Sequence, residues 1–158
     1  MAETLKRKFT PPLSWRTITA LIIVAGLHTF ATWYSWYSYW PWFDIPMHML
    51  GGFFIASAFL DIFVKKGRLQ AFNGSRIAGI ILCISFVILI GALWEFFEFG
   101  VDRIIGKPYM SLGLFDTLKD LADDLIGGFT CAVVAYFGKS YRTTAPSSSA
   151  HKALSSSS

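Results

Sequence analysis

The stretch AGIILCISFVILIGALWEFFEF, from Ala78 to Phe99, decides the fold of this chain. It contains no proline and no charged residue before Glu95. A helix needs about 20 mostly apolar residues to cross a hydrocarbon core about 30 Å thick. We therefore predict a membrane-spanning helix over residues 77–99, with Glu95 and Glu98 near its end.

The composition of the whole chain agrees with a membrane protein. Of its 158 residues, 54% are hydrophobic and 15% are charged, whereas a soluble domain is about 25% charged. These values exclude an ordinary cytosolic enzyme, a disordered chain and a coiled coil. The net charge of +4 does not indicate nucleic acid, because the basic residues flank long apolar runs instead of forming a polar face. The expected partner is the lipid bilayer.

Three further apolar runs are candidates for spanning helices, although the last is short, Gly-rich and acidic at its start. Short connections between the runs predict an all-α, four-helix transmembrane bundle with antiparallel neighbours. A short interfacial helix before the last span is compatible with this pattern. The four predicted spans are residues 17–37, 46–64, 77–99 and 121–137. We assign residues 1–16 to a cytoplasmic N-terminal segment, 17–139 to the membrane domain and 140–158 to a disordered Ser-rich tail.

Lys and Arg residues are distributed unevenly among the connections. Eleven lie in the N-terminal segment, the second connection and the C-terminal segment, and three lie on the other side: Arg103, Lys107 and Lys119. Because basic residues favour the cytoplasmic side, both termini are predicted to be cytoplasmic. The first connection, SWYSYWPWF (35–43), has no basic residue and is typical of an aromatic anchor at the outer interface. A resting surface for a lipid substrate is the alternative interpretation.

Eight of the ten acidic residues lie at or near the predicted outer ends of the helices. Asp44 and His48 are spaced i, i+4 and share a face if their helix has begun by Asp44, although Asp44 could also be an N-cap. Ionisable residues within membrane spans are costly and usually face a site, so we interpret His48 as functional. His28, in the outer half of the first span, is either a hydrogen-bonded core residue or a second imidazole of the same site.

Two more acidic groups approach the same membrane face. Glu95 and Glu98 are surrounded by aromatic residues and need a cation, a shared proton or a basic partner, unless they have emerged into the headgroup layer. The second group is a stripe about 12 Å long on one helix face. The stripe consists of Asp116, Asp120 and Asp124. Asp123 points elsewhere and is expected to be solvated.

These groups together predict a divalent metal site at the outer end of the bundle. Imidazole and carboxylate ligands suit Mg²⁺, Mn²⁺, Fe²⁺ or Zn²⁺. Glu95 and Glu98 are candidates for a catalytic acid and base. Arg103 and Lys107, in a predicted loop over residues 100–115, are candidates for binding an anionic substrate group, although a plain exposed loop is the simpler interpretation. The predicted metal ligands are His48, Asp44, Glu95, Asp120 and Asp124.

Three segments, read in order, resemble a known pattern. They are DIPMHMLGG (44–52), WEFFEFGVD (94–102) and DTLKDLADDLIGG (116–128), and they resemble the YjdF-type family of small bacterial membrane proteins. This resemblance implies a multi-pass protein of the bacterial inner membrane and a family of unknown function. More loosely, the segments are similar to VanZ-like proteins, which are linked to glycopeptide resistance and the cell envelope, although Ile45 stands where that pattern has Lys.

The patterns leave three classes of function open. The first is a metal-dependent hydrolase or transferase that acts on a lipid-linked group of the cell envelope. The second is a proton- or cation-coupled transporter that uses the same carboxylates. The third is a structural membrane protein in which the acidic cluster only organises the helix ends. The chain has no Walker loop and no GxSxG, HExxH or CxxC pattern, which argues against nucleotide hydrolysis, serine-hydrolase chemistry and zincin proteolysis.

Overall fold

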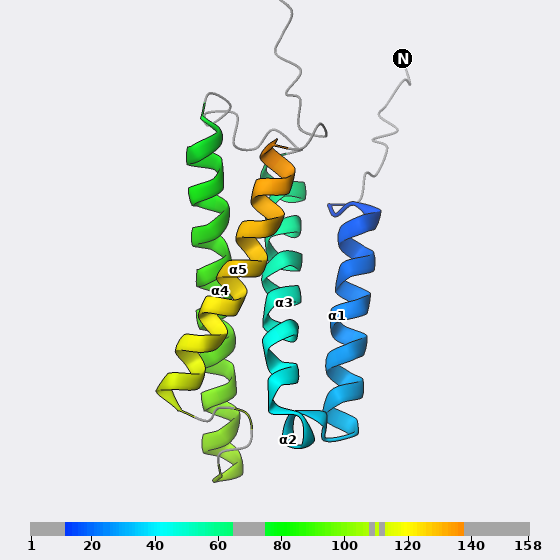
Figure 1. The fold of residues 1–158 in the computed structure, drawn as a ribbon, viewed down its shortest axis with the longest axis vertical. Coiled ribbons are helices and arrows are strands. Elements are labelled where there is room, and N and C mark those ends of the chain that lie inside the picture. Colours follow the sequence, from blue (N-terminus) through cyan, green and yellow to red (C-terminus); the bar gives the residue numbers. More distant parts are fainter. Residues whose placement is uncertain (1–11, 65–74, 108–109, 111–112, 138–158) are drawn as a thin grey trace, which may run out of the picture.

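The computed structural model describes residues 12–64, 75–107, 110 and 113–137. Within these residues every regular element is a helix, so the predicted all-α fold class is confirmed. The predicted N-terminal segment up to residue 11, most of the second connection and the predicted Ser-rich tail lie outside the described residues. The long helices, which run alternately up and down (Figure 1), are α1 (Trp15–Trp33), α3 (Asp44–Phe59), α4 (Arg76–Ile105) and α5 (Leu114–Phe137).

Three segments among the described residues are long and apolar enough to cross a membrane. They are Trp15–Trp33, Pro41–Val64 and Ile77–Ile105. The molecule is therefore a bundle of membrane helices. The fourth long helix, α5, carries several Asp residues in its first half, so a fourth span over residues 121–137 stays a prediction.

The first helix is shorter than the sequence predicts. It ends at Trp33 instead of Tyr37, because Ser35 adopts a left-handed conformation with φ of 56°. The chain then forms the short helix α2 (Trp36–Tyr39) and the 3₁₀ turn η1 (Pro41–Phe43). The ring of Trp36 packs edge-on against Phe43, with ring centroids 5.2 Å apart. The aromatic connection is thus a compact folded segment, which explains why the long helix stops before it.

The other helices also differ in their bounds from the predicted spans. The second predicted span begins at Asp44 and passes into a π-helical turn, η2 (Leu60–Val64). Helix α4 continues to Ile105 and stops at Gly106, which has a positive φ of 77°. Arg103 therefore lies in the last turn of a helix and not in the predicted loop. Helix α5 is continuous from Leu114, so there is no separate interfacial helix within its described residues.

Glycine residues allow α3 and α5 to approach each other at backbone distance. A Cβ atom at Gly52 would overlap the backbone of Asp124, and one at Gly127 would overlap the backbone of Met49. Small residues at such positions are typical of close helix contacts in membranes. Farther along the same helices lies an apolar core that also includes α4. The core consists of Ala56, Phe59, Leu60, Cys83, Val87, Cys131 and Ala132.

The ends of the helices define two ends of the bundle (Figure 1). The N-terminal end of α1 and the C-terminal end of α5 lie at one end, and α2 lies at the opposite end, next to the start of α3. Asp44 is the first residue of α3, and the first turns of α5 are directed toward the same end. The predicted site residues of these two helices therefore lie toward the α2 end. The assignment of this end to the outer membrane surface stays a prediction from the basic residues.

Candidate metal centre

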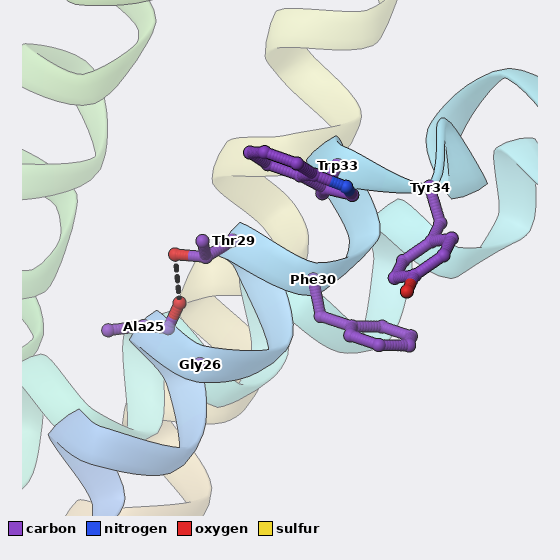
Figure 2. Close-up of a pocket in the computed structure, with 6 residues that line it drawn as sticks. All are labelled: Ala25, Gly26, Thr29, Phe30, Trp33 and Tyr34. Carbon is purple, nitrogen blue, oxygen red and sulfur yellow. Dashed lines mark hydrogen bonds between the residues drawn. The ribbon is translucent and has the colours of Figure 1, made fainter.

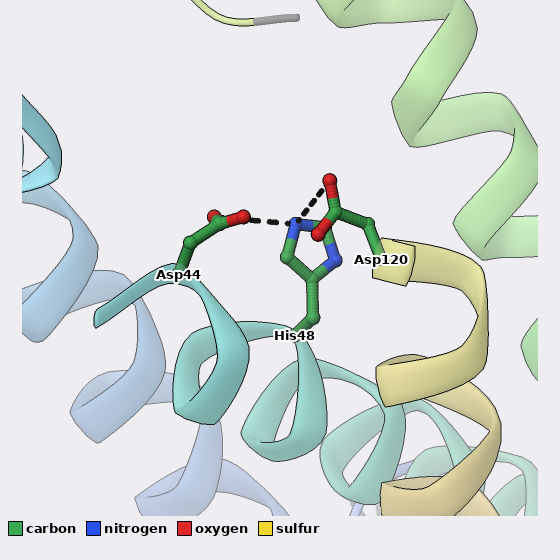
Figure 3. A group of neighbouring side chains, drawn as sticks. All are labelled: Asp44, His48 and Asp120. Atoms are coloured by element: carbon green, nitrogen blue, oxygen red, sulfur yellow. Dashed lines mark ion pairs between the residues drawn. The ribbon is translucent and has the colours of Figure 1, made fainter. Parts of the chain in front are cut away.

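The centre of the candidate site is His48, which is 8% exposed and lies one helical turn after Asp44 on α3. Its Nε2 atom is 3.5 Å from Asp44 Oδ1 and 3.8 Å from Asp120 Oδ2 (Figure 3). Its Nδ1 atom is 3.5 Å from Asp124 Oδ1. Both ring nitrogens therefore face carboxylates, and those carboxylates come from two helices.

Three of the predicted metal ligands come together in a compact group. One ligand atom each from Asp44, His48 and Asp120 lies within 4.8 Å of the other two. Figure 3 shows the two carboxylates on either side of the Nε2 atom. Asp124 is 4% exposed and contacts the other ring nitrogen. Asp124 therefore faces the side of the imidazole away from the compact group, and its role as a metal ligand stays a prediction.

Lys119 is part of this site, and the sequence analysis missed it. Its Nζ atom is 2.7 Å from Asp120 Oδ1, 2.8 Å from Asp44 Oδ2 and 3.4 Å from Asp116 Oδ1. The sequence left a cation, a shared proton or a basic partner open as the group that offsets the buried acidic charge, and Lys119 supplies a basic partner for Asp44, Asp116 and Asp120. The signal was the spacing of Lys119, which directly precedes Asp120 and follows Asp116 by three residues.

The pKa values of Lys119 and Asp120, in the first turns of α5, depend on how deeply each group is buried and on the ion pair between them. Burial lowers the pKa of Lys119, but the hydrogen bonds that its ammonium donates to Asp120 and Asp44 outweigh burial and raise that pKa above its usual value. Burial raises the pKa of Asp120, which is 1% exposed, to about 7, although Lys119 and His48 favour its charged form. Lys119 is therefore charged at neutral pH, and the protonation of Asp120 changes near neutrality.

Glu95 and Glu98 are both buried, at 8% exposure each, so they have not emerged from the bundle. The indole Nε1 of Trp94 donates a hydrogen bond of 2.8 Å to Glu98 Oε1. Glu95 interacts with the hydroxyl of Thr117 and with the charges of His48 and Asp124. Its Oε1 atom has no hydrogen-bond partner among the described residues. An unpaired buried carboxylate oxygen is costly, and this one belongs to a residue whose charge interacts with His48 and Asp124.

The remaining predicted residues lie elsewhere or differ from expectation. Arg103 is exposed and its guanidinium stacks on the ring of Phe99, 4.9 Å from the ring centroid. Lys107 is exposed as well, and among the described residues neither cation forms an ion pair with a carboxylate of the site.

Asp123 is buried at 9% exposure, so the expectation that it is solvated is wrong. It faces the interior because the rotation of α5 is set by its contacts with α3 and α4.

His28 lies near the group formed by Asp44, His48 and Asp120, and the charges of His48 and Asp44 act on it. Its Nδ1 is 2.9 Å from the hydroxyl of Tyr37, and its ring meets Trp94 edge-on with centroids 5.7 Å apart. Of the two interpretations that the sequence left open, this contact shows a hydrogen-bonded histidine that is not in the compact ligand group.

A hollow of about 570 Å³ on the exposed face of α1 is separate from this chemistry (Figure 2). Its lining includes Trp33, Phe30 and Gly26, and the hydroxyl of Thr29 is hydrogen-bonded to the carbonyl of Ala25 in its own helix. Its lining contains no acidic, basic or histidine side chain. Such a surface suits contact with lipid chains, and we assign it no catalytic role.

The fold and the site together define a helical membrane protein with a buried His/carboxylate cluster at one end. The model of the family described as "Predicted membrane protein (DUF2238)" matches residues 1–140, so the chain belongs to this family. This match confirms the YjdF-type resemblance.

One curated relative extends the comparison. It is a Thermotoga maritima protein named "Uncharacterized protein", which is 33% identical over 99 residues. The match covers 63% of this chain and 50% of the relative, so the chain spans about half the length of the curated relative that it matches. No solved structure matches the chain.

Proposed function

We propose that this membrane protein is a divalent-metal-dependent hydrolase or transferase that acts on a lipid-linked group of the cell envelope. The observation that carries the proposal is the convergence of Asp44, His48 and Asp120, whose ligand atoms lie within 4.8 Å of one another. One imidazole and two carboxylates are a ligand set used for Mn²⁺, Fe²⁺ and Zn²⁺. The contact between Asp124 and the second nitrogen of His48 supports the assignment, because metal-bound histidines are usually held in this way.

In this proposal each residue has a distinct role. His48 Nε2, Asp44 and Asp120 hold the ion, and Asp124 orients the imidazole. Glu95 offers an unpaired carboxylate oxygen as a further ligand or as a base, and Glu98 is held by Trp94 as a candidate acid. When bound, the ion would polarise a phosphoryl or carbonyl oxygen and lower the pKa of a bound water.

The position of the cluster supports a lipid-linked substrate. The cluster lies toward the end of the bundle at which the aromatic segment over residues 35–43 joins α1 and α3. Trp and Tyr rings favour the headgroup layer. A site at this depth would lie level with the polar head of a lipid while the acyl chains remain in the bilayer.

Transport of protons or cations is the second candidate, and His48 favours it because both of its nitrogens face carboxylates. A transport path requires polar groups that continue toward the other end of the bundle. Asp61 is the described carboxylate nearest that end of α3, and it accepts hydrogen bonds from the backbone of Ser14 and the hydroxyl of Thr17. Between His48 and Asp61, α3 contributes Ala56 and Phe59 to the apolar core, and η2 contributes Leu60. This separation favours a site open to one side.

Elemental analysis of the purified protein tests the proposal. We expect wild type to retain about one equivalent of Mn, Fe or Zn after exchange into metal-free detergent buffer, and His48→Ala to lose it. His28→Gln is the matched control, because it removes an imidazole that is outside the compact ligand group. Equal metal content in wild type and His48→Ala would contradict the proposed site.

A further inference from the structure

The cation that occupies the cluster in this structure is the side chain of Lys119. Its Nζ lies between Asp44 and Asp120, at 2.8 and 2.7 Å. These are the two carboxylates that also flank the Nε2 atom of His48. Each of them therefore presents one oxygen to the ammonium and the other to the imidazole.

We propose that Lys119 is an internal counter-ion that competes with the divalent metal, and that metal binding displaces its ammonium from Asp44 and Asp120 to Asp116. This inference rests on the proposed metal site and adds its regulation. A divalent ion bound between Asp44, His48 and Asp120 would share both carboxylates with the ammonium. The ion and the ammonium would occupy different oxygens of the same two carboxylates. Two cations this close repel each other in a buried site, and this repulsion favours a form in which the ammonium has moved away.

The structure offers Lys119 a place to go. Asp116 lies one turn earlier on α5, and its Oδ1 is already 3.4 Å from Nζ. The Lys119 side chain is 29% exposed, which is the largest exposure among these ion-paired side chains. It is a flexible chain with a compact charge. Displacement therefore moves the ammonium outward along its own helix and does not disturb the packing between α3 and α5.

Glu95 gives a second, independent indication of a ligand other than Lys119. It is 8% exposed, and its Oε1 atom has no hydrogen-bond partner among the described residues. Its carboxylate interacts with the charges of His48 and Asp124, which places it beside the ligand group. The ammonium of Lys119 pairs with Asp44, Asp116 and Asp120, so it does not supply a donor to Glu95 Oε1. An ion bound nearer to His48 would give this oxygen a positive partner.

The consequence is a site that is stable in two forms. In the metal-free form, Lys119 offsets part of the charge of Asp44 and Asp120. In the metal-bound form, the ion takes over that role, and Lys119 pairs with Asp116, one turn earlier on α5. The affinity for metal is then set by the difference between the two forms and is lower than the ligand set alone would give.

The test is to titrate Mn²⁺ into full-length protein in detergent and to follow binding by calorimetry. Lys119→Met removes the ammonium and retains most of the length of the side chain. We expect it to bind Mn²⁺ about tenfold or more tightly than wild type. Lys119→Arg retains a fixed charge that pairs with carboxylates in a bidentate manner, and we expect it to bind Mn²⁺ more weakly than wild type. Lys107→Met is the matched control and should bind as wild type does.

The outcomes separate this inference from the proposed function. If His48→Ala abolishes Mn²⁺ binding while Lys119→Met binds as wild type does or more weakly, Lys119 is not a competitor, and the metal site stands. If neither wild type nor Lys119→Met binds Mn²⁺, both the metal site and the competition are wrong. If Lys119→Met folds only when Mn²⁺ is present, the ion is replacing the missing charge, which supports the inference. If it does not fold in either condition, Lys119→Arg decides, and binding equal to or tighter than that of wild type would overturn the inference.

Discussion

Gly52 on α3 lies against the backbone of Asp124 on α5, and a Cβ atom at residue 52 would overlap that backbone. The same carboxylate-bearing residue contacts Nδ1 of His48 through its side chain. One close helix contact therefore sets the distance between the imidazole of α3 and the carboxylates of α5. The packing of small residues and the geometry of the candidate site are consequently linked.

Gly52→Ala should destabilise the bundle. The added methyl group has to push α5 away from α3, and such overpacking typically costs about 1–3 kcal/mol. We expect a lower midpoint of thermal unfolding in detergent and weaker Mn²⁺ binding, because Asp124 moves away from His48. Gly51→Ala is the control, since its nearest neighbour, Asp124 Oδ1, would be 3.7 Å away, an ordinary contact. Equal midpoints for the two variants would show that the close contact is not formed.

Divalent ions should raise the unfolding midpoint of wild type. A ligand that binds only the folded state at a hundred times its Kd adds about 2.7 kcal/mol of stability. We expect this shift with Mn²⁺, Zn²⁺ or Mg²⁺, and we expect it to disappear in His48→Ala and Glu95→Ala. Glu98→Gln should retain the shift, because the Glu98 carboxylate is hydrogen-bonded to Trp94. Loss of the shift in Glu98→Gln alone would instead place Glu98 in the metal centre and Glu95 outside it.

The sequence was sufficient to predict the helical membrane fold and much of the cluster. Apolar runs of spanning length predict the helices, and the i, i+4 spacings of Asp44 with His48 and of Asp120 with Asp124 place these pairs on common faces. Spacing on single helices could not show which cation pairs with which carboxylate. The role of Lys119 depends on the contact between α3 and α5, and it was therefore counted only as a basic residue near the membrane surface.

The features that differ from the sequence-based predictions also depend on contacts between segments or on local backbone conformation. Asp123 is buried because the rotation of α5 about its axis is fixed by its neighbours and not by its own sequence. Helix α1 ends at Trp33 because the aromatic side chains after it pack against one another. Arg103 lies in the last turn of α4 because nothing stops that helix before Gly106. Each of these features depends on tertiary contacts or on a backbone conformation that composition does not reveal.

The predicted orientation of the chain can be tested by cysteine labelling. Ser38 lies on α2 and is exposed, whereas the two native cysteines, Cys83 and Cys131, are buried. We expect Ser38→Cys to react with a membrane-impermeant maleimide in intact cells. A cysteine introduced in the Ser-rich segment after residue 143 should react only after the cells are opened. Labelling of that segment from outside would contradict the predicted cytoplasmic termini and would place the His48 cluster at the inner surface.

The stability of the metal-free protein should fall as the pH rises from about 4 to 7. Burial raises the pKa of Asp120 from 3.8 to about 7 in the folded state, where Lys119, His48 and Asp44 also act on it. A carboxyl group with a raised pKa stabilises the fold when protonated, so this contribution is complete below about pH 4 and is lost as the pH passes 7. We expect the unfolding midpoint in EDTA to decrease over this range in wild type and to change much less in Asp120→Asn. Asp102→Asn, which alters the carboxylate bonded to the backbone of Met110, should retain the slope.

Saturating Mn²⁺ should reverse the slope in wild type, because the ion binds the charged carboxylate. A midpoint that still decreases with rising pH in saturating Mn²⁺ would mean that the acids share protons, which favours the transport or structural alternative.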